Sequence, residues 1–231
     1  MKGLQPKGIA RRNKMLLAAI QLFLEQGYEK TTTAQISRAA GMSPTSFFAA
    51  FENKEALLLK LTQIMFENQF AKARLFAENH EPLMVYCLET ALQINITELS
   101  ESLREIYVMA YTLPSTSEYI YRSTAIQIKN IFAAYMPDAE DKDFYEMDIA
   151  SGSITRGFMA KPCDMYFTLD RKLSRYLDCC LKLYNVPTEK RNSLIEAVLA
   201  VDLNSVAAKL IEEIVAKAET GLEEAIGNKI T

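Results

Sequence analysis

The chain has 231 residues, which is long enough for one large domain or for a small head on a larger body. Eight glycines and seven prolines are few for this length, and an all-β fold with its many turns needs more of them. The composition therefore favours a mostly helical protein. The formal net charge of −3 excludes a uniformly basic nucleic-acid coat protein, but it does not say how charge is distributed along the chain.

The histidine and cysteine content argues against a metal site. One histidine, His80, and four cysteines form no C-x-x-C, H-E-x-x-H or zinc-finger spacing. The sequence has no apolar run near the roughly 18 residues of a membrane span, and its basic start lacks the pattern of a secretory leader. We therefore expect a cytoplasmic protein with reduced thiols, no metal, no cofactor and no membrane association.

The charges divide unevenly along the chain. Residues 1–60 hold nine Lys or Arg and four Asp or Glu, a balance of +5, whereas residues 61–231 hold seventeen and twenty-five, a balance of −8. A short basic head on an acidic body is typical of a protein whose head alone meets phosphate.

The periodicity of the head predicts three helices in succession. Apolar side chains recur at helical spacing over residues 11–26, and Gly27 follows as a residue that ends a helix without a Cβ clash. A second, short helix is expected over 34–40, after threonines that can cap it and before Gly41. The third is expected over 44–51, and a proline suits its first position.

Two short helices joined by a turn at Gly41 form a helix-turn-helix unit. A fourth helix is expected to begin at Asn53, a good N-cap, with Glu55 in its first turn. We therefore divide the chain into a helix-turn-helix head, 1–58, and a helical body, 59–231.

Residues 9–61, about a quarter of the chain, resemble the tetracycline-repressor-like (TetR) transcriptional regulators. The matching segments follow the family's order and spacing without a gap: AAIQLF at 18–23, GY at 27–28, TTT at 31–33, ISRAAGMS at 36–43 and FFAAFENKEAL at 47–57. The resemblance implies an all-α homodimer. Each chain would have an N-terminal three-helix helix-turn-helix DNA-binding domain followed by a larger helical effector-binding and dimerisation domain.

The resemblance also implies which residues meet a double-stranded DNA operator. Thr33 would cap the second helix near one phosphate, and Lys54 would approach another from the start of the fourth helix, whose N-terminus favours anions. Together with the basic residues of the first helix, the expected DNA-binding residues are Arg11, Arg12, Thr31, Thr32, Thr33, Ser43, Pro44, Thr45, Ser46, Phe47, Phe48 and Lys54.

The expected recognition helix departs from the family pattern. Pro44 and Thr45 stand where the family usually has lysine and glycine, and residues 48–50 read Phe-Ala-Ala instead of tyrosine, histidine, tyrosine. Base reading then depends on hydroxyls and on apolar contact with thymine methyl groups, which predicts A·T-rich half-sites. Part of the affinity would come from the basic tail, Lys2, Lys7, Arg11, Arg12 and Lys14.

The body is expected to continue in helices separated by prolines and polar loops. The expected ranges are 83–99, 102–112, 117–135, 143–159, 168–184, 188–202 and 204–226. The body carries ten of the eleven tyrosines and seven of the ten methionines, which suit an adaptable pocket for a small organic effector but equally suit a simple core. The candidate pocket residues are Tyr86, Tyr107, Met109, Tyr111, Tyr121, Phe132 and Phe158.

A homodimer interface is expected from the helices at 143–159 and 168–184. The first carries small residues that permit close helix approach, and the second carries one apolar stripe. The candidate interface residues are Gly152, Gly157, Leu169, Leu173, Tyr176, Leu177 and Cys180. The helices after Pro187 could cover or replace part of this surface.

The leading hypothesis is a ligand-responsive transcriptional repressor, and the family also permits an activator. A helical enzyme has little support, because the sequence has no nucleophile elbow, phosphate-binding loop or metal cluster. A third hypothesis is a helical interaction protein that keeps the fold but has lost specific DNA binding, since the recognition helix departs so far from the family.

Overall fold

The structure is a computed structural model that describes residues 6–77 and 81–227, and all regular structure in this part of the chain is helical. The all-α prediction is confirmed. The head contains α1 (Pro6–Gln26), α2 (Thr33–Ala39), the 3-10 helix η1 (Pro44–Ala49) and the start of α3 (Lys54–Ala77). His80, the single histidine, lies outside the described residues.

The body helices follow the expected order and differ from the expected ranges by a few residues. They are α4 (Pro82–Leu99), α5 (Glu101–Ala110), α6 (Pro114–Phe132), the 3-10 helix η2 (Ala133–Tyr135), α7 (Asp141–Ala160), α8 (Leu169–Leu183), α9 (Thr188–Leu199) and α10 (Leu203–Gly227). The largest differences are of three residues: α9 ends three residues earlier than expected, and α6 begins three residues earlier. Its first residue is Pro114, and proline fits there because the first helical N–H has no partner within the helix.

The apolar side chains form two main cores. One core lies in the head and includes Phe23, Ile36, Phe47 and Leu57. The other fills the body from α4 to α10. The expected boundary at residues 58 and 59 falls inside the continuous helix α3, and Ile106 of α5 belongs to the head core. The division into 1–58 and 59–231 therefore stays a prediction.

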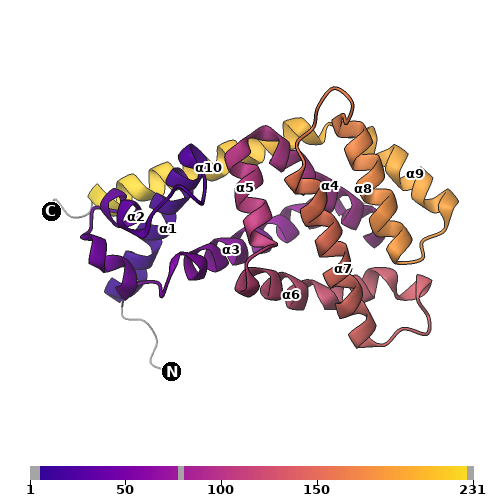
Figure 1. The fold of residues 1–231 in the computed structure, drawn as a ribbon, viewed down its shortest axis with the longest axis horizontal. Helices are drawn as coiled ribbons and strands as arrows, with labels where there is room; N and C mark the ends of the chain where they lie inside the picture. The colour runs from indigo at the N-terminus through magenta and orange to yellow at the C-terminus, as the bar shows by residue number, and fades with distance from the viewer. Residues whose placement is uncertain (1–5, 78–80, 228–231) are drawn as a thin grey trace.

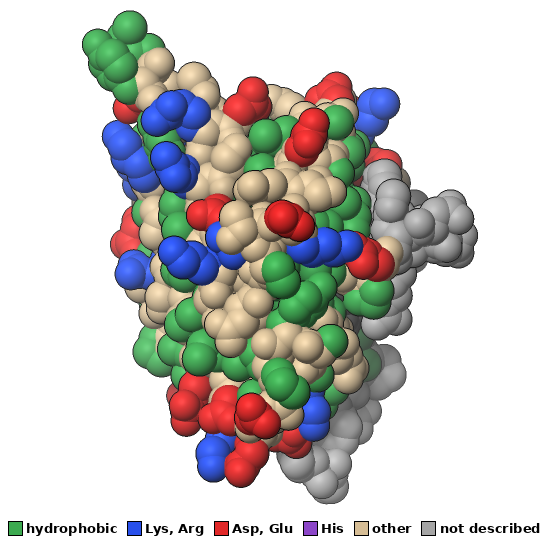
Figure 2. All heavy atoms as spheres, turned by 90° about the vertical axis from the view of Figure 1, so that its right-hand side faces the viewer, with side chains coloured by type: hydrophobic (Ala, Val, Ile, Leu, Met, Phe, Trp, Pro, Cys, Tyr) green, Lys and Arg blue, Asp and Glu red, His purple; other side chains and the backbone are tan. Residues whose placement is uncertain are grey.

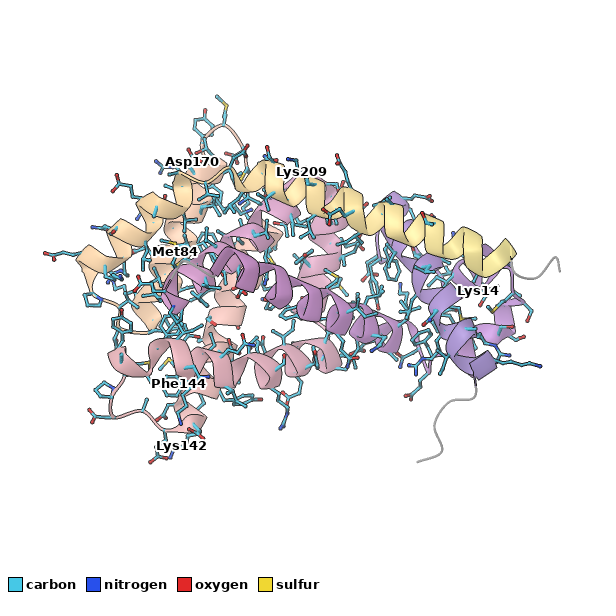
Figure 3. The ribbon with its side chains drawn as sticks, turned by 180° about the vertical axis from the view of Figure 1, so that it is seen from behind. Lys14, Met84, Lys142, Phe144, Asp170 and Lys209 are labelled. Atoms are coloured by element: carbon cyan, nitrogen blue, oxygen red, sulfur yellow. The ribbon has the colours of Figure 1, made fainter. Side chains whose placement is uncertain are left out.

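The last two helices give the body an additional layer. Helix α9 packs against α8 and α4, and α10 runs from the body along α4 to α1 in the head (Figure 1). Figure 3 shows the same path from behind, with Lys14 in the head and Lys142 and Phe144 at the far end of the body. Leu203 and Ala207 of α10 are buried in the body core, so this helix fastens the C-terminal segment to both parts of the chain.

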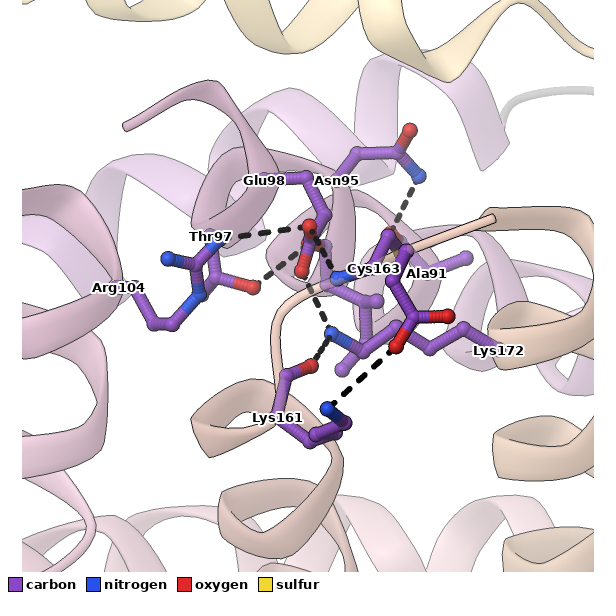
Figure 4. A network of polar contacts seen from close by, with 10 residues as sticks. Ala91, Asn95, Thr97, Glu98, Arg104, Lys161, Cys163 and Lys172 are labelled. Carbon is purple, nitrogen blue, oxygen red and sulfur yellow. Dashed lines mark hydrogen bonds and ion pairs between the residues drawn. The ribbon is translucent and has the colours of Figure 1, made fainter. Parts of the chain in front are cut away.

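A buried ion pair joins the end of α4 to α8, and hydrogen bonds tie the loop before α8 to the same pair (Figure 4). Lys172 is fully buried, and its Nζ lies 2.6 Å from Oε1 of Glu98 and 2.5 Å from the carbonyl oxygen of Lys161. Glu98 also accepts hydrogen bonds from the Cys163 N–H at 3.0 Å and from Arg104 at 3.3 Å. Burial acts to raise the pKa of Glu98, but these donors outweigh it and hold that pKa below its usual range.

We predict that Lys172→Met destabilises the protein by about 3 kcal/mol, measured as the free energy of unfolding in urea. Removing one partner of a buried pair leaves the remaining charge without full compensation. The matched control is Lys182→Met, which changes an exposed lysine on the same helix and should stay within about 0.5 kcal/mol of the parent protein. Equal stability of the two variants would contradict a structural role for the buried pair.

Candidate DNA-binding surface and effector pocket

The N-cap of α2 is Thr32 and not Thr33, so the predicted cap is wrong by one residue. The Thr32 hydroxyl accepts the Gln35 N–H at 3.2 Å, and the Gln35 side chain accepts the Thr32 N–H at 2.7 Å. This reciprocal capping box satisfies two N–H groups that the helix leaves free. Thr33 is the first residue of α2 and is half-buried.

Thr31 is buried inside the head and does not lie on its surface. It is only 1% exposed, and its hydroxyl donates to the Gly27 carbonyl at 2.7 Å. Gly27 has φ +87°, which L side chains rarely adopt, so it ends α1 as its position in the sequence predicts. The assignment of Thr31 to the DNA surface is therefore corrected, because a buried hydroxyl cannot reach a phosphate.

The expected recognition helix is a 3-10 helix that ends at Ala49. It packs against α2, and Phe47 points inward with 0% exposure, which corrects its assignment as a DNA contact. Phe48 is 65% exposed and stands edge-on to Phe47, with ring centroids 5.6 Å apart. Adjacent residues on so short a helix point in different directions, so one phenylalanine anchors the segment and the other is presented to solvent.

Three hydroxyls cluster where η1 begins. Ser43 does not cap the helix with its side chain, but its hydroxyl lies 3.2 Å from that of Thr45 and 2.9 Å from that of Ser46. Ser43, Pro44 and Thr45 are exposed and Ser46 is half-buried. These residues and Phe48 form the outward surface of the helix-turn-helix unit.

Basic side chains of α1 border this surface. Lys7, Arg11 and Lys14 line an open depression of about 480 Å³ together with Ser43 and Ser46. Cations and hydroxyls in one concave surface are suited to hold phosphate oxygens.

Arg12 of the expected basic tail does not join this depression. Arg12 turns away, with its guanidinium 4.8 Å from the centre of the Phe51 ring. Lys2 lies outside the described residues.

Lys54 closes the turn between α1 and α2. Its ammonium group donates to the carbonyls of Tyr28 at 2.8 Å and Thr31 at 3.0 Å, with Glu29 O at 3.5 Å. It also lies 4.1 Å from the centre of the Tyr28 ring. Burial lowers the pKa of Lys54, although nearby carboxylates oppose that effect. An ammonium has three donors, and carbonyls engage them here, which corrects the expectation that Lys54 points at a phosphate.

The head is joined to the body through α5 and the residues that follow it. Glu105 accepts the Glu29 N–H at 2.6 Å, and a Cβ on Gly27 would collide with the Glu105 carboxylate. Ile106 is buried in the head core, and Met109 packs against the same core. Met109 was expected to line the pocket. It lies instead on the side of α5 that faces the head.

A second carboxylate joins α3 to the start of α6. Oε1 of Glu55 accepts the Ser115 N–H at 3.0 Å and the Ser115 hydroxyl at 2.6 Å. These two bonds hold the pKa of Glu55 below its usual range. The first turn of α3 is thereby tied to the first turn of α6.

A cavity of about 60 Å³ lies within the body among α3, α4, α5, α6 and α7. Three of the seven expected pocket residues line it: Tyr86, Tyr111 and Tyr121. The other lining residues are Phe66, Glu89, Thr90, Gln93, Ile120, Thr124, Gln127, Ile128, Ile131, Asp148, Ser151, Gly152 and Thr155. The enclosed space holds only a few water molecules, so an organic ligand requires the wall to open.

The remaining expected pocket residues are packed elsewhere. Tyr107 is buried in the body core, and Phe132 stacks on Tyr184 with ring centroids 4.0 Å apart. Phe158 packs against Tyr176 at 5.7 Å between centroids. Periodicity marks these side chains as inward-facing, but it does not separate the residues of a filled core from those around a cavity.

The sequence analysis missed Asp148, the most unusual residue of the cavity wall. Asp148 is 6% exposed and accepts hydrogen bonds from the hydroxyls of Thr124 and Ser151, the latter at 3.3 Å. Burial raises the pKa of Asp148 to about 6, although these bonds act in the opposite direction. An acidic residue on the inner face of an amphipathic helix was the signal that could have identified it.

Most of the expected dimer residues lie inside the chain. Leu173, Tyr176, Leu177 and Cys180 belong to the body core and are at most 5% exposed, because α4, α7 and α9 cover the apolar stripe of α8. Gly152 is also buried, with the Tyr121 ring so close that a Cβ would lie 2.5 Å from it. These five assignments are corrected, since none of these side chains is available to a partner.

Gly157 and Leu169 remain accessible. Gly157 is exposed, with no described atom within 4 Å of an added Cβ, and Leu169 is half-buried. On the outward face of α7, Gly157 follows Ile149 and Ser153, which are also exposed. Figure 2 faces the end of the molecule that carries α9, where apolar, acidic and basic side chains are interspersed.

Two further classes of site were sought in the described residues. No group of three or more His, Cys, Asp or Glu side chains in this part of the chain could hold a metal ion. No helix among the described residues has the length and apolarity needed to cross a membrane.

Residues 15–61 match the model of the family described as bacterial regulatory proteins, tetR family. The HTH-type transcriptional regulator TcmR of Streptomyces glaucescens is 41% identical over 58 residues, which are 25% of this chain and 26% of TcmR. The chain thus matches about a quarter of the length of this curated relative.

Two solved structures described as a gamma-butyrolactone receptor (ArpA-like protein) align with this chain, each at 18% identity. The first has a TM-score of 0.47 and covers 90% of this chain and 99% of its own. The second has a TM-score of 0.46 and covers 89% and 99%.

The match includes both the helix-turn-helix unit and the start of α3, the elements that carry the outward surface described above. It is a family of regulatory proteins and not of enzymes. The N-terminal head therefore matches the tetR family of bacterial regulatory proteins over residues 15–61.

Proposed function

We propose that this protein is a cytoplasmic transcriptional repressor that binds a near-palindromic DNA operator as a homodimer and is released by a small organic effector. The observation that carries the proposal is the surface of the head. There, the exposed side of η1 lies beside the depression lined by Lys7, Arg11 and Lys14. Phosphate contacts would position the head, and η1 would read base edges in the major groove.

Base reading would depend on few side chains. Thr45 can exchange a hydrogen bond with a base edge, and the exposed ring of Phe48 can contact a thymine methyl group. Helix η1 contains no lysine or arginine, so the bidentate contact that selects guanine is missing from it. This chemistry favours A·T-rich half-sites.

Effector control would operate through α5 and α6. Tyr111 lines the cavity directly after α5, and Met109, two residues earlier, packs against the head core. Tyr121 lines the cavity from α6, whose first turn is bonded to Glu55 through Ser115. A ligand that displaces these walls would shift the population of head orientations away from the one that fits DNA.

For the homodimer we propose the outward face of α7 as the contact surface. Ile149, Ser153 and Gly157 lie on it, and small side chains there allow a partner helix to approach closely. A dimer would place the two heads about one DNA turn apart, roughly 34 Å, on the two half-sites.

Selection of bound DNA from a random pool tests the proposed activity. We expect paired A·T-rich half-sites, and Phe48→Ala should lower discrimination at thymine positions by about 1 kcal/mol. A G·C-rich consensus would contradict this account of base reading, and failure to enrich any sequence at low salt would favour an interaction protein without specific DNA binding.

Salt dependence separates phosphate contacts from structural contacts in the head. Arg11→Ala should lower affinity and flatten the slope of log K against log salt by about 1.8 for a dimer, since each lost phosphate contact is worth about 0.9. Lys54→Met should instead lower the free energy of unfolding by roughly 1–3 kcal/mol, because it leaves carbonyls in the α1–α2 turn without their donor.

The slope for Lys54→Met should equal that of the parent protein. Arg171→Ala, on an exposed position of α8, is the matched control for Arg11→Ala and should change neither quantity. If Lys54→Met flattens the slope as much as Arg11→Ala, Lys54 contacts a phosphate after all.

Gly157→Arg tests the dimer surface. The long charged side chain would separate α7 from a partner helix, so sedimentation equilibrium should show a monomer where the parent protein is a dimer. The matched control is Ala197→Arg, which places the same side chain at an exposed position of another helix, α9, and should leave the dimer intact. A dimer that survives Gly157→Arg would place the interface elsewhere.

A further inference from the structure

The described wall of the body cavity includes one strongly buried carboxylate, that of Asp148. Asp148 and Glu89 both line it, and none of the described residues around it is Lys, Arg or His. Buried charges in proteins are normally paired, since the desolvation of an isolated charge is costly. Among the described residues that line the cavity, the Asp148 carboxylate therefore has no cationic partner.

The hydrogen bonds to Asp148 do not replace a cation. Each of its two hydroxyl donors has a single proton and a competing carbonyl in its own helix. Thr124 lies 2.7 Å from the Ile120 carbonyl oxygen, and Ser151 lies 3.1 Å from the carbonyl oxygen of Asp148 itself. A carboxylate has about four acceptor positions, so two shared donors leave it short of partners.

The groups that face Asp148 from neighbouring helices are also uncharged. They are the phenols of Tyr111, Tyr121 and Tyr184 and the thiol of Cys180. Burial raises the pKa of each of these groups, so all four are neutral near pH 7. Glu89 on α4 adds a second carboxylate, and Arg156, two turns along α7, is exposed to solvent.

Aromatic rings line the same cavity as the Asp148 carboxylate. Phe66, Tyr86, Tyr111 and Tyr121 all line the cavity. The faces of aromatic rings attract cations, and the attraction strengthens where water is excluded. We propose that the cavity binds an organic cation, whose charged group pairs with Asp148 among these rings. The inference rests on the proposed function only in making this cation the effector.

Opening of the cavity would involve Tyr121. Its ring lies directly on the backbone of α7 at Gly152, and its side chain is half-exposed. The cavity of about 60 Å³ is too small for a substituted ammonium ion, so binding would move this ring outward. Tyr121 belongs to α6, the helix tied to Glu55 in the first turn of α3, which connects occupancy of the cavity to the head.

Binding of a cation would depend on pH. The pKa of Asp148 is about 6, so the carboxylate is mostly ionised at pH 7.5 and mostly protonated at pH 5. A cation prefers the ionised form, which predicts affinity that falls about tenfold between these two values. The four neutral groups around Asp148 do not titrate in this range.

The same ionisation predicts how stability changes with pH in the absence of ligand. Because folding raises the pKa of Asp148, its contribution is favourable in acid and is lost as pH rises through 6. The denaturation midpoint of Asp148→Asn should therefore rise relative to that of the parent protein as the pH increases from 4 to 7. Above pH 7 the difference between the two midpoints should stay constant.

The direct test uses the full-length chain, a series of quaternary ammonium ions from tetramethylammonium to benzyltrimethylammonium, and neopentylbenzene as the neutral isostere of the last. Isothermal titration should show that benzyltrimethylammonium binds at least tenfold more tightly than neopentylbenzene at pH 7.5. Asp148→Asn should remove this preference. The matched control is Asp170→Asn, an exposed acid in the first turn of α8, which should retain it.

Three results would overturn the proposal: no binding by any cation of the series, equal binding of cation and isostere, or unchanged cation binding in Asp148→Asn. If Asp148→Asn fails to fold, judged by helical circular dichroism, the pH profile of the parent protein decides. Cation affinity should fall between pH 7.5 and 5 while isostere affinity stays constant, and a flat cation profile would overturn the proposal.

DNA binding, measured in the same samples by fluorescence anisotropy, separates the two levels of inference. If the cation binds but the affinity for DNA does not change, the cavity is a cation site, and the proposal that this cation releases the protein from DNA is wrong. If a neutral compound releases DNA, and Asp148→Asn responds to it like the parent protein, the protein is a ligand-controlled regulator but its effector is not an organic cation.

Discussion

The turn between α1 and α2 depends on two charged side chains that come from elsewhere in the chain. Lys54 of α3 donates to its carbonyls, and Glu105 of α5 accepts one of its N–H groups. The positive φ of Gly27 makes the turn possible, and the absence of a Cβ there gives Glu105 its place. Because Glu105 belongs to the body, the geometry of the head is fixed partly from outside it. The orientation of η1 toward DNA thus follows from how α5 is held.

Helix α5 separates two interiors with different properties. Toward the head it contributes Ile106 to a closely filled apolar core. Tyr111, directly after its C-terminus, lines a cavity whose described wall includes the buried Asp148 carboxylate. A filled core resists displacement, whereas a small polar cavity can gain free energy when a ligand supplies its missing partner. In the proposed function, this asymmetry would let one short helix hold the head in place and also transmit the binding of a ligand.

The C-terminal helices changed the interpretation of the body most. The apolar stripe on α8 is real, but α4, α7 and α9 cover it, and so Tyr176 and Cys180 are core residues. Periodicity shows that a helix face is buried and does not show what buries it. The small residues of α7 likewise look alike in the sequence but have different surroundings in the structure. Gly152 accommodates Tyr121 within the chain, and Gly157 faces solvent.

The sequence by itself determined the all-helical fold, the order of the helices and the helix-turn-helix head, because caps, glycines and apolar spacing act over a few residues. It also determined the uneven distribution of charge. Only the tertiary structure decided which side of each short element faces outward: Phe47 inward and Phe48 outward, Thr31 inside the head, and Lys54 in a turn. It alone brought Asp148 beside Thr124 and four aromatic rings, since the partners of a buried group come from helices distant in sequence.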